Sequence, residues 1–147
     1  MMDEKKNATI NVVAIVLEKL EFERQQQISS AIFSSDGSIT TVNLKLEAKI
    51  ERQFSEDKTK LLTKFQLKVS DADNTLSILC RVAGLFVQTE DGSMNLEEFA
   101  KVNAPTFLLP YVRENISTVT MKAGLPPIIL PPLNMLKFIN ETSVEEK

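Results

Sequence analysis

The most distinctive feature of the sequence is a proline-rich apolar segment in its C-terminal third. All six prolines of the 147-residue chain lie between Pro105 and Pro132, and four of them fall in one short loop that starts at Pro126. Proline has no N–H to donate to a helix or a sheet, so this loop is predicted to be irregular. Prolines also stiffen the backbone, so side chains on the loop would lose little conformational freedom on binding. The large aliphatic residues of the loop are Leu125, Ile128, Ile129, Leu130 and Leu133.

Two interpretations of this loop stay open from the residues alone. Its side chains either pack into the core of their own domain or form a surface that binds extended, apolar polypeptide beside a sheet edge. For the second interpretation we predict a binding surface that combines the loop with aromatic and apolar residues elsewhere in the chain. The predicted members are Leu85, Phe86, Phe107, Tyr111, Leu125, Ile128, Ile129, Leu130, Leu133 and Phe138.

The composition argues against catalysis. The chain has no histidine and one cysteine, Cys80, which excludes imidazole acid–base chemistry and zinc sites built from histidine or several thiolates. Its four glycines lie far apart, which excludes a glycine-rich phosphate loop. We therefore predict no catalytic residue, no metal and no cofactor, with Cys80 as a small buried apolar residue. An enzyme that used Cys80 or a carboxylate cluster would need a deep polar pocket.

Charge and hydropathy restrict the partners and the compartment. The net charge of −3 gives no electrostatic attraction to nucleic acid. No apolar run approaches the roughly 18 residues that span a bilayer, and the polar N-terminal residues do not resemble a signal peptide. A lone cysteine fits a reducing compartment. We expect a cytoplasmic protein without membrane insertion.

Alternating apolar and polar residues predict the elements that position the loop. Residues 42–51, 61–69 and 76–85 alternate and are joined by short polar turns, which predicts an antiparallel meander with one charged face. The stretch from Ile10 to Arg24 is apolar at both alternating positions and changes phase near Glu18, which predicts a bulged first strand. The predicted fold class is α+β, a four-stranded antiparallel sheet with one face covered by C-terminal helices.

The helices are predicted from the sequence between the last strand and the C-terminus. A short helix is expected over residues 96–102, which Pro105 ends. The next helix is expected to carry Pro110 in its first turn and to stop at Gly124. A last helix is expected after Asn134, which would cap it.

Two apolar surfaces predict an oligomer. The first strand lacks a polar face, and the second helix has a narrow apolar stripe typical of helix–helix contact, so a monomer would expose one of them. The predicted interface residues are Val13, Ile15, Leu17, Leu109, Val112, Ile116 and Val119. We expect one domain of residues 1–147, with flexible tails at residues 1–8 and 141–147.

The C-terminal third resembles the SecB family of export chaperones. The resemblance rests on Asn-Ala-Pro from Asn103, Leu-Leu-Pro-Tyr-Val-Arg-Glu from Leu108, Gly-Leu-Pro from Gly124, Leu-Pro-Pro-Leu-Asn from Leu130 and Ala-Gly-Leu-Phe from Ala83. It implies a four-stranded antiparallel sheet backed by helices and assembled as a dimer of dimers, a homotetramer. It also implies an ATP-independent holdase that binds unfolded polypeptides, among them preproteins for export, in a groove between the sheet, the long helix and the proline loop.

The same resemblance implies delivery of clients to the SecA motor, and one departure bears on that step. SecB proteins offer acidic residues on the exposed sheet face to SecA. This chain keeps Glu23 but has Lys19 for an acidic residue, and Ser77 and Leu79 where a leucine and a glutamate are expected. SecA stays a candidate partner, with Glu23 as its candidate contact. Two alternatives remain: a SecB-like chaperone dedicated to one partner such as an antitoxin, and a non-catalytic adaptor that binds one folded partner.

Overall fold

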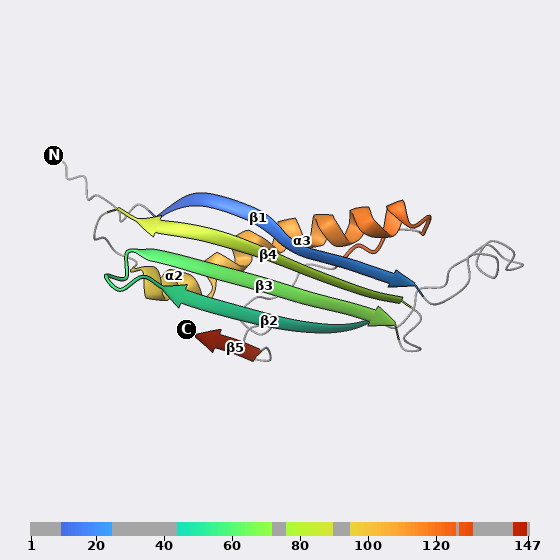
Figure 1. Ribbon diagram of the computed structural model, residues 1–147, viewed down its shortest axis with the longest axis horizontal. Helices are drawn as coiled ribbons and strands as arrows, with labels where there is room; N and C mark the ends of the chain where they lie inside the picture. The colour runs from blue at the N-terminus through green and yellow to red at the C-terminus, as the bar shows by residue number, and fades with distance from the viewer. Residues whose placement is uncertain are drawn as a thin grey trace, which may run out of the picture.

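The computed structural model describes residues 10–24, 44–71, 76–89, 95–125, 127–130 and 143–146 (Figure 1). Its long strands are β1 (Ile10–Arg24), β2 (Leu44–Phe54), β3 (Lys60–Asp71) and β4 (Leu76–Gln88), which pair antiparallel in the order β1-β4-β3-β2. Two helices, α2 (Leu96–Lys101) and α3 (Asn103–Lys122), pack against one face of this sheet (Figure 1). The predicted antiparallel sheet and its helical cover are confirmed.

Helix α3 begins earlier than the sequence indicated. It starts at Asn103, so Pro105 lies in the first turn and Pro110 lies inside the helix. The prediction that Pro110 opens the helix is wrong. The extra turn buries Ala104 and Leu108 completely, and this packing offsets the hydrogen bond that Pro110 cannot donate. The predicted stop is confirmed, because Gly124 follows the helix with a φ of +77°.

Two bulges explain why β1 is apolar at both alternating positions. The pairing of β1 with β4 shifts between Val12 and Ala14 and again between Leu17 and Lys19. The second shift confirms the bulge predicted near Glu18. Each extra residue reverses the alternation of faces, so apolar residues at odd and at even positions of β1 lie on the same face of the strand. The β1 residues paired with the helix-facing residues of β4 are Val12, Ile15, Leu17, Leu20 and Phe22.

A short C-terminal strand joins the sheet at the edge opposite β1. Strand β5 (Ser143–Glu146) runs parallel to β2, with its residues paired to Lys49–Arg52. Residues 143–146, which were expected to belong to a flexible tail, are thus placed in a strand beside β2. The outer edge of β2 carries main-chain N–H and C=O groups that no strand of the meander pairs. An extended tail can form hydrogen bonds with these groups through its own main chain, whatever its side chains are. The helix expected after Asn134 lies outside the described residues.

The core lies between the sheet and α3, and Gly84 sets how closely the two approach. A Cβ atom built on Gly84 would lie 2.8 Å from Cδ2 of Leu108 and 3.0 Å from the ring of Phe86. Both neighbours are fully buried. A side chain at this position of β4 would force the buried side chain of Leu108, or α3 with it, to shift, so glycine allows the helix to lie close to the sheet here.

Candidate polypeptide-binding surface

An aromatic cluster connects the core to the exposed side of α3. Phe86 of β4 lies 5.1 Å from Phe99 of α2, edge to face, and 6.2 Å from Phe107 of α3, measured between ring centroids. Phe86 and Phe99 are buried, whereas Phe107 is 47% exposed. The cluster therefore fixes the ring of Phe107 from below and leaves its outer side open to a ligand.

Phe107 borders an open hollow of about 790 Å³ along the first half of α3. Tyr111, one helical turn further on, is 45% exposed and borders the same hollow. The described residues around it are Val102, Asn103, Thr106, Phe107, Pro110, Tyr111 and Glu114. Its wall is mainly apolar with a few polar groups, which suits an apolar side chain carried on a polypeptide.

The proline loop after α3 alternates between buried and exposed residues. Leu130 is 2% exposed and Ile128 packs against the core, whereas Ile129 between them is 72% exposed. Alternation of this kind is typical of an extended segment with one side against the protein. Core packing and an exposed apolar side chain are therefore both present in the loop, on opposite sides of one short segment.

Two side chains of α3 hold the loop in this orientation. The main-chain N–H of Ile128 donates to the hydroxyl oxygen of Thr120 (3.0 Å), and Thr120 is fully buried. The Nη2 group of Arg113, about two turns earlier on the helix, donates to the carbonyl oxygen of Leu130 (3.1 Å). Because Arg113 precedes Thr120 on the helix, the loop runs back along α3 between these two anchors.

Three predicted members of the binding surface are exposed, and others are not. Phe107, Tyr111 and Ile129 are exposed, while Leu125 and Ile128 are half-buried. The prediction is wrong for Phe86 and Leu130, whose exposed fractions are 0% and 2%, because the core takes their whole side chains. Leu85 lies on the sheet face away from α3, since it alternates with Phe86, and cannot line a groove beside that helix. Leu133 and Phe138 lie outside the described residues.

The predicted oligomer interface divides in the same way. Leu109, Val112 and Ile116 are 6%, 0% and 0% exposed, so the prediction that they face another subunit is wrong. The apolar face of their own sheet already covers this stripe, and Val119 at its end is half-buried. On β1, Val13 and Leu17 are 56% and 47% exposed and Ile15 is half-buried.

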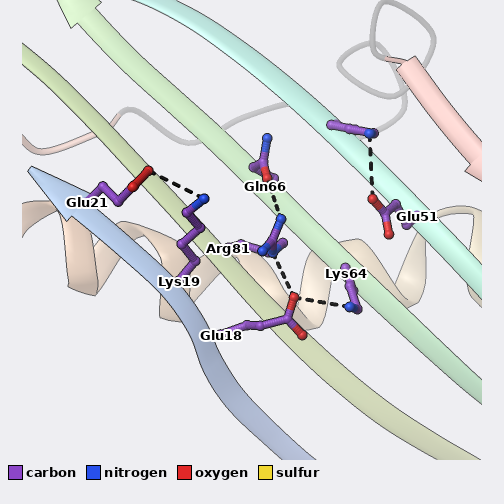
Figure 2. Close-up of polar contacts among 8 residues, drawn as sticks. Glu18, Lys19, Glu21, Glu51, Lys64, Gln66 and Arg81 are labelled. Carbon is purple, nitrogen blue, oxygen red and sulfur yellow. Dashed lines mark hydrogen bonds and ion pairs between the residues drawn. The ribbon is translucent and has the colours of Figure 1, made fainter.

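The sheet face away from α3 carries charges of both signs (Figure 2). Glu18, at the second bulge of β1, lies 2.7 Å from Nε of Arg81 and 3.1 Å from Nζ of Lys64. Lys19 pairs with Glu21 at 3.6 Å (Figure 2). Glu23 is exposed and borders, with Lys68 and Leu79 among others, an open hollow of about 720 Å³. Lysine and arginine side chains thus neutralise much of the acidic charge on this face.

Cys80 is positioned as a packing residue. Its side chain is fully buried, and burial raises the pKa of the thiol to about 11, so the thiol stays protonated at neutral pH. Among the described residues, no cluster of cysteine and carboxylate side chains is arranged to hold a metal ion. Within the same residues, no helix is long and apolar enough to cross a membrane.

Sequence reasoning missed the parts of this surface that act through main-chain groups. Thr120 was not noticed, and Arg113 gave no sign that its partner is a carbonyl oxygen of the loop. Phe99 also escaped notice, although an aromatic residue in the short helix before Pro105 was a usable signal for the aromatic cluster.

Comparison with known proteins places the chain in a family. The model of the preprotein translocase subunit SecB matches residues 3–145. The protein belongs to the SecB family. The protein-export protein SecB of Neorickettsia sennetsu is 32% identical over 133 residues, covering 89% of this chain and 73% of that one. An uncharacterized protein of Methanocaldococcus jannaschii, MJ0357, is 38% identical over 77 residues, and this match spans half of each chain.

The fold is shared with a solved SecB-like structure. That structure is the SecB-like chaperone Rv1957 of Mycobacterium tuberculosis in complex with a ChAD peptide from the HigA1 antitoxin. Its TM-score is 0.65, its identity is 16%, and the match covers 85% of this chain and 88% of that one. The resemblance to SecB recognised in the C-terminal third extends over nearly the whole chain, since the family model matches residues 3–145.

Proposed function

We propose that this SecB-family protein is an ATP-independent chaperone, a holdase, that keeps client polypeptides unfolded by binding their apolar segments. The observation that carries the proposal is the set of exposed apolar side chains on α3 and on the loop that follows it. Phe107, Tyr111 and Ile129 stay exposed, whereas the apolar residues between α3 and the sheet are buried. A surface of this kind can bind many apolar sequences, because it offers contact area without a set of directed polar groups.

Removing two of these side chains should test the proposal. Tyr111→Ala combined with Ile129→Ala should weaken binding of a reduced, alkylated client at least tenfold, since burying one large apolar side chain contributes about 1.5–3 kcal/mol. Both residues are exposed, so the melting temperature should hardly change. Met121→Ala is the matched control, because Met121 is an exposed apolar residue of α3 outside the hollow.

The same assay separates a holdase from an adaptor. A holdase should suppress aggregation of several unrelated unfolded proteins, and the double variant should lose this effect for all of them. Protection of none of these clients, together with tight binding of a single folded partner, would favour the adaptor instead.

We further propose that copies of the chain associate through β1. Val12, Val13, Val16, Leu17 and Leu20 are all between 37% and 56% exposed on this strand. Strand β1 also forms an edge of the sheet, so its outer main-chain groups can pair with another strand. Association at β1 is compatible with a dimer or with the dimer of dimers implied by the resemblance. The single, buried cysteine supports work in a reducing compartment such as the cytoplasm.

A chaperone dedicated to one partner, uncoupled from SecA, is the second candidate. It is favoured by the mixed charge of the exposed sheet face, where Lys19, Lys64 and Arg81 pair with acidic groups. The SecB-like chaperone that shares this fold was solved with an antitoxin peptide, which makes an antitoxin one such partner.

Binding to purified SecA should distinguish an export chaperone from a chaperone dedicated to one partner. If the dedicated function is correct, the wild-type protein should bind SecA weakly, and Glu23→Lys should change that affinity no more than Glu47→Lys on β2. Tight binding that weakens as salt is raised, and that Glu23→Lys abolishes while Glu47→Lys does not, would instead establish coupling to SecA through β1.

A further inference from the structure

The hydrogen bonds at the end of α3 converge on one residue. The carbonyl oxygen of Thr120 accepts from the N–H groups of Ala123 (3.1 Å) and Leu125 (3.0 Å), which closes the helix at Gly124. Its hydroxyl donates to the helix carbonyls of Ser117 (2.8 Å) or Ile116 (3.0 Å). Because the hydroxyl proton is directed into the helix, the oxygen is free to accept from the N–H of Ile128 (3.0 Å). One buried side chain thus joins the helix stop to the loop beyond it.

Arg113 supplies a second anchor two residues further along the loop. Its guanidinium donates to the carbonyl of Leu130, and within the part of the chain that the structure describes these two hydrogen bonds are the ones that fix residues 127–130. Ile128 and Leu130 lie on the same side of the extended segment, against the protein. Anchors at these two residues therefore determine that Ile129 faces outward.

We propose that Thr120 and Arg113 are positioning residues of the client-binding surface. They hold the proline loop so that Ile129 is presented to clients. The inference rests on the proposed holdase function and adds the residues that pre-organise its site. Without the anchors, Ile128 to Leu130 would sample several orientations, and a client would have to restrict them on binding. Neither residue touches the client in this proposal, so both act through Ile129.

The test is a double-variant cycle on client affinity. The probe is a fluorescently labelled, reduced and alkylated protein that cannot refold, and its Kd is measured per folded chaperone molecule. Thr120→Val keeps the side-chain shape but removes the hydroxyl, and should weaken binding roughly fivefold, which corresponds to one ordinary hydrogen bond. Thr120→Ser keeps the hydroxyl and should restore most of the affinity. In the Ile129→Ala background, Thr120→Val should have almost no further effect.

A second arm covers the case in which Thr120→Val does not fold. Arg113→Met retains the apolar stem of the side chain and removes the donor, and should give the same pattern with and without Ile129. Amide hydrogen exchange supplies a readout that is independent of binding, because the N–H of Ile128 should exchange faster in Thr120→Val while the amides of β3 and β4 keep their protection.

The outcomes separate this inference from the function on which it rests. Equal losses with and without Ile129 would show that the two residues support the fold only, and the inference would be wrong. It would also be wrong if Ile129→Ala weakened binding while Thr120→Val and Arg113→Met did not. If the wild-type protein bound no unfolded client, the holdase proposal and this inference would fall together.

Discussion

Val16→Asp in strand β1 is expected to convert an assembled form of the protein into monomers. Val16 is 53% exposed on an edge strand whose neighbouring residues Val13 and Leu17 are also exposed. A charge at the centre of such a contact would lose its water. Burying a polar group without a partner costs a few kcal/mol, and we take a value of about 3 kcal/mol. A cost of this size would weaken a dimer roughly a hundredfold.

Light scattering over a range of protein concentrations checks this result. Gln53→Asp is the matched control, since it adds the same charge at an exposed position of β2, a strand far from β1 in the sheet order. The control should assemble like the wild type. Wild-type protein that is already monomeric at micromolar concentration would contradict the proposed association, and equal weakening by both substitutions would mean that β1 is not the contact.

Gly84→Ala should destabilise the fold by about 1–3 kcal/mol, as expected when a group is forced into a closely packed core. The added Cβ would lie 2.8 Å from Cδ2 of Leu108. Leu108 is fully buried and cannot move aside without displacing its neighbours. Either the side chain of Leu108 or the whole helix would have to shift, and a shift of the helix would displace Phe107 and Tyr111 as well. Urea unfolding measures the loss of stability, and client affinity measures the displacement of the surface.

Leu108→Ala supplies the internal control for this prediction. Alone it should lower the free energy of unfolding by about 2–5 kcal/mol, as a leucine truncated in a core does. In the Gly84→Ala background the cost should be smaller, because the new methyl group takes up space that Leu108 has left. Strictly additive effects, or a neutral Gly84→Ala, would show that the approach of α3 to β4 is not limited at this point.

Alternation of apolar and polar residues was sufficient to predict the sheet. In β2 and β3 the pattern follows one rule, side chains on alternate faces, and the strands and their order along the chain were confirmed. The phase change near Glu18 likewise predicted a bulge, because one extra residue in a strand reverses the alternation of apolar and polar residues. Strands and bulges depend on residues that are adjacent in the chain, so they can be predicted from the order of residues in the sequence.

The errors concern which surface covers an apolar stripe. The spacing of Leu109, Val112 and Ile116 shows which side of the helix is buried. The same spacing would result whether a neighbouring subunit or the chain's own sheet buries that side. Pro110 was misplaced for a related reason, since the burial of Leu108 against β4 is invisible before the fold is known. The anchor from Arg113 to the carbonyl of Leu130 was missed because every residue has a carbonyl.

Strand β5 has a consequence for how far an assembly of this protein can grow. Within the described residues, β5 pairs with Lys49–Arg52 of β2, while the outer edge of β1 has no strand beside it. A sheet that can be extended at both edges adds copies head to tail and forms fibres when the rotation does not close. A sheet extended at β1 only can pair with the same edge of one other copy, and that contact is symmetric and complete. Strand β5 is the outer strand at the β2 edge, but it has only four residues and carries Glu145 and Glu146, and short, charged edge strands disfavour further pairing. Sheet-to-sheet growth is thereby biased toward pairs formed at β1.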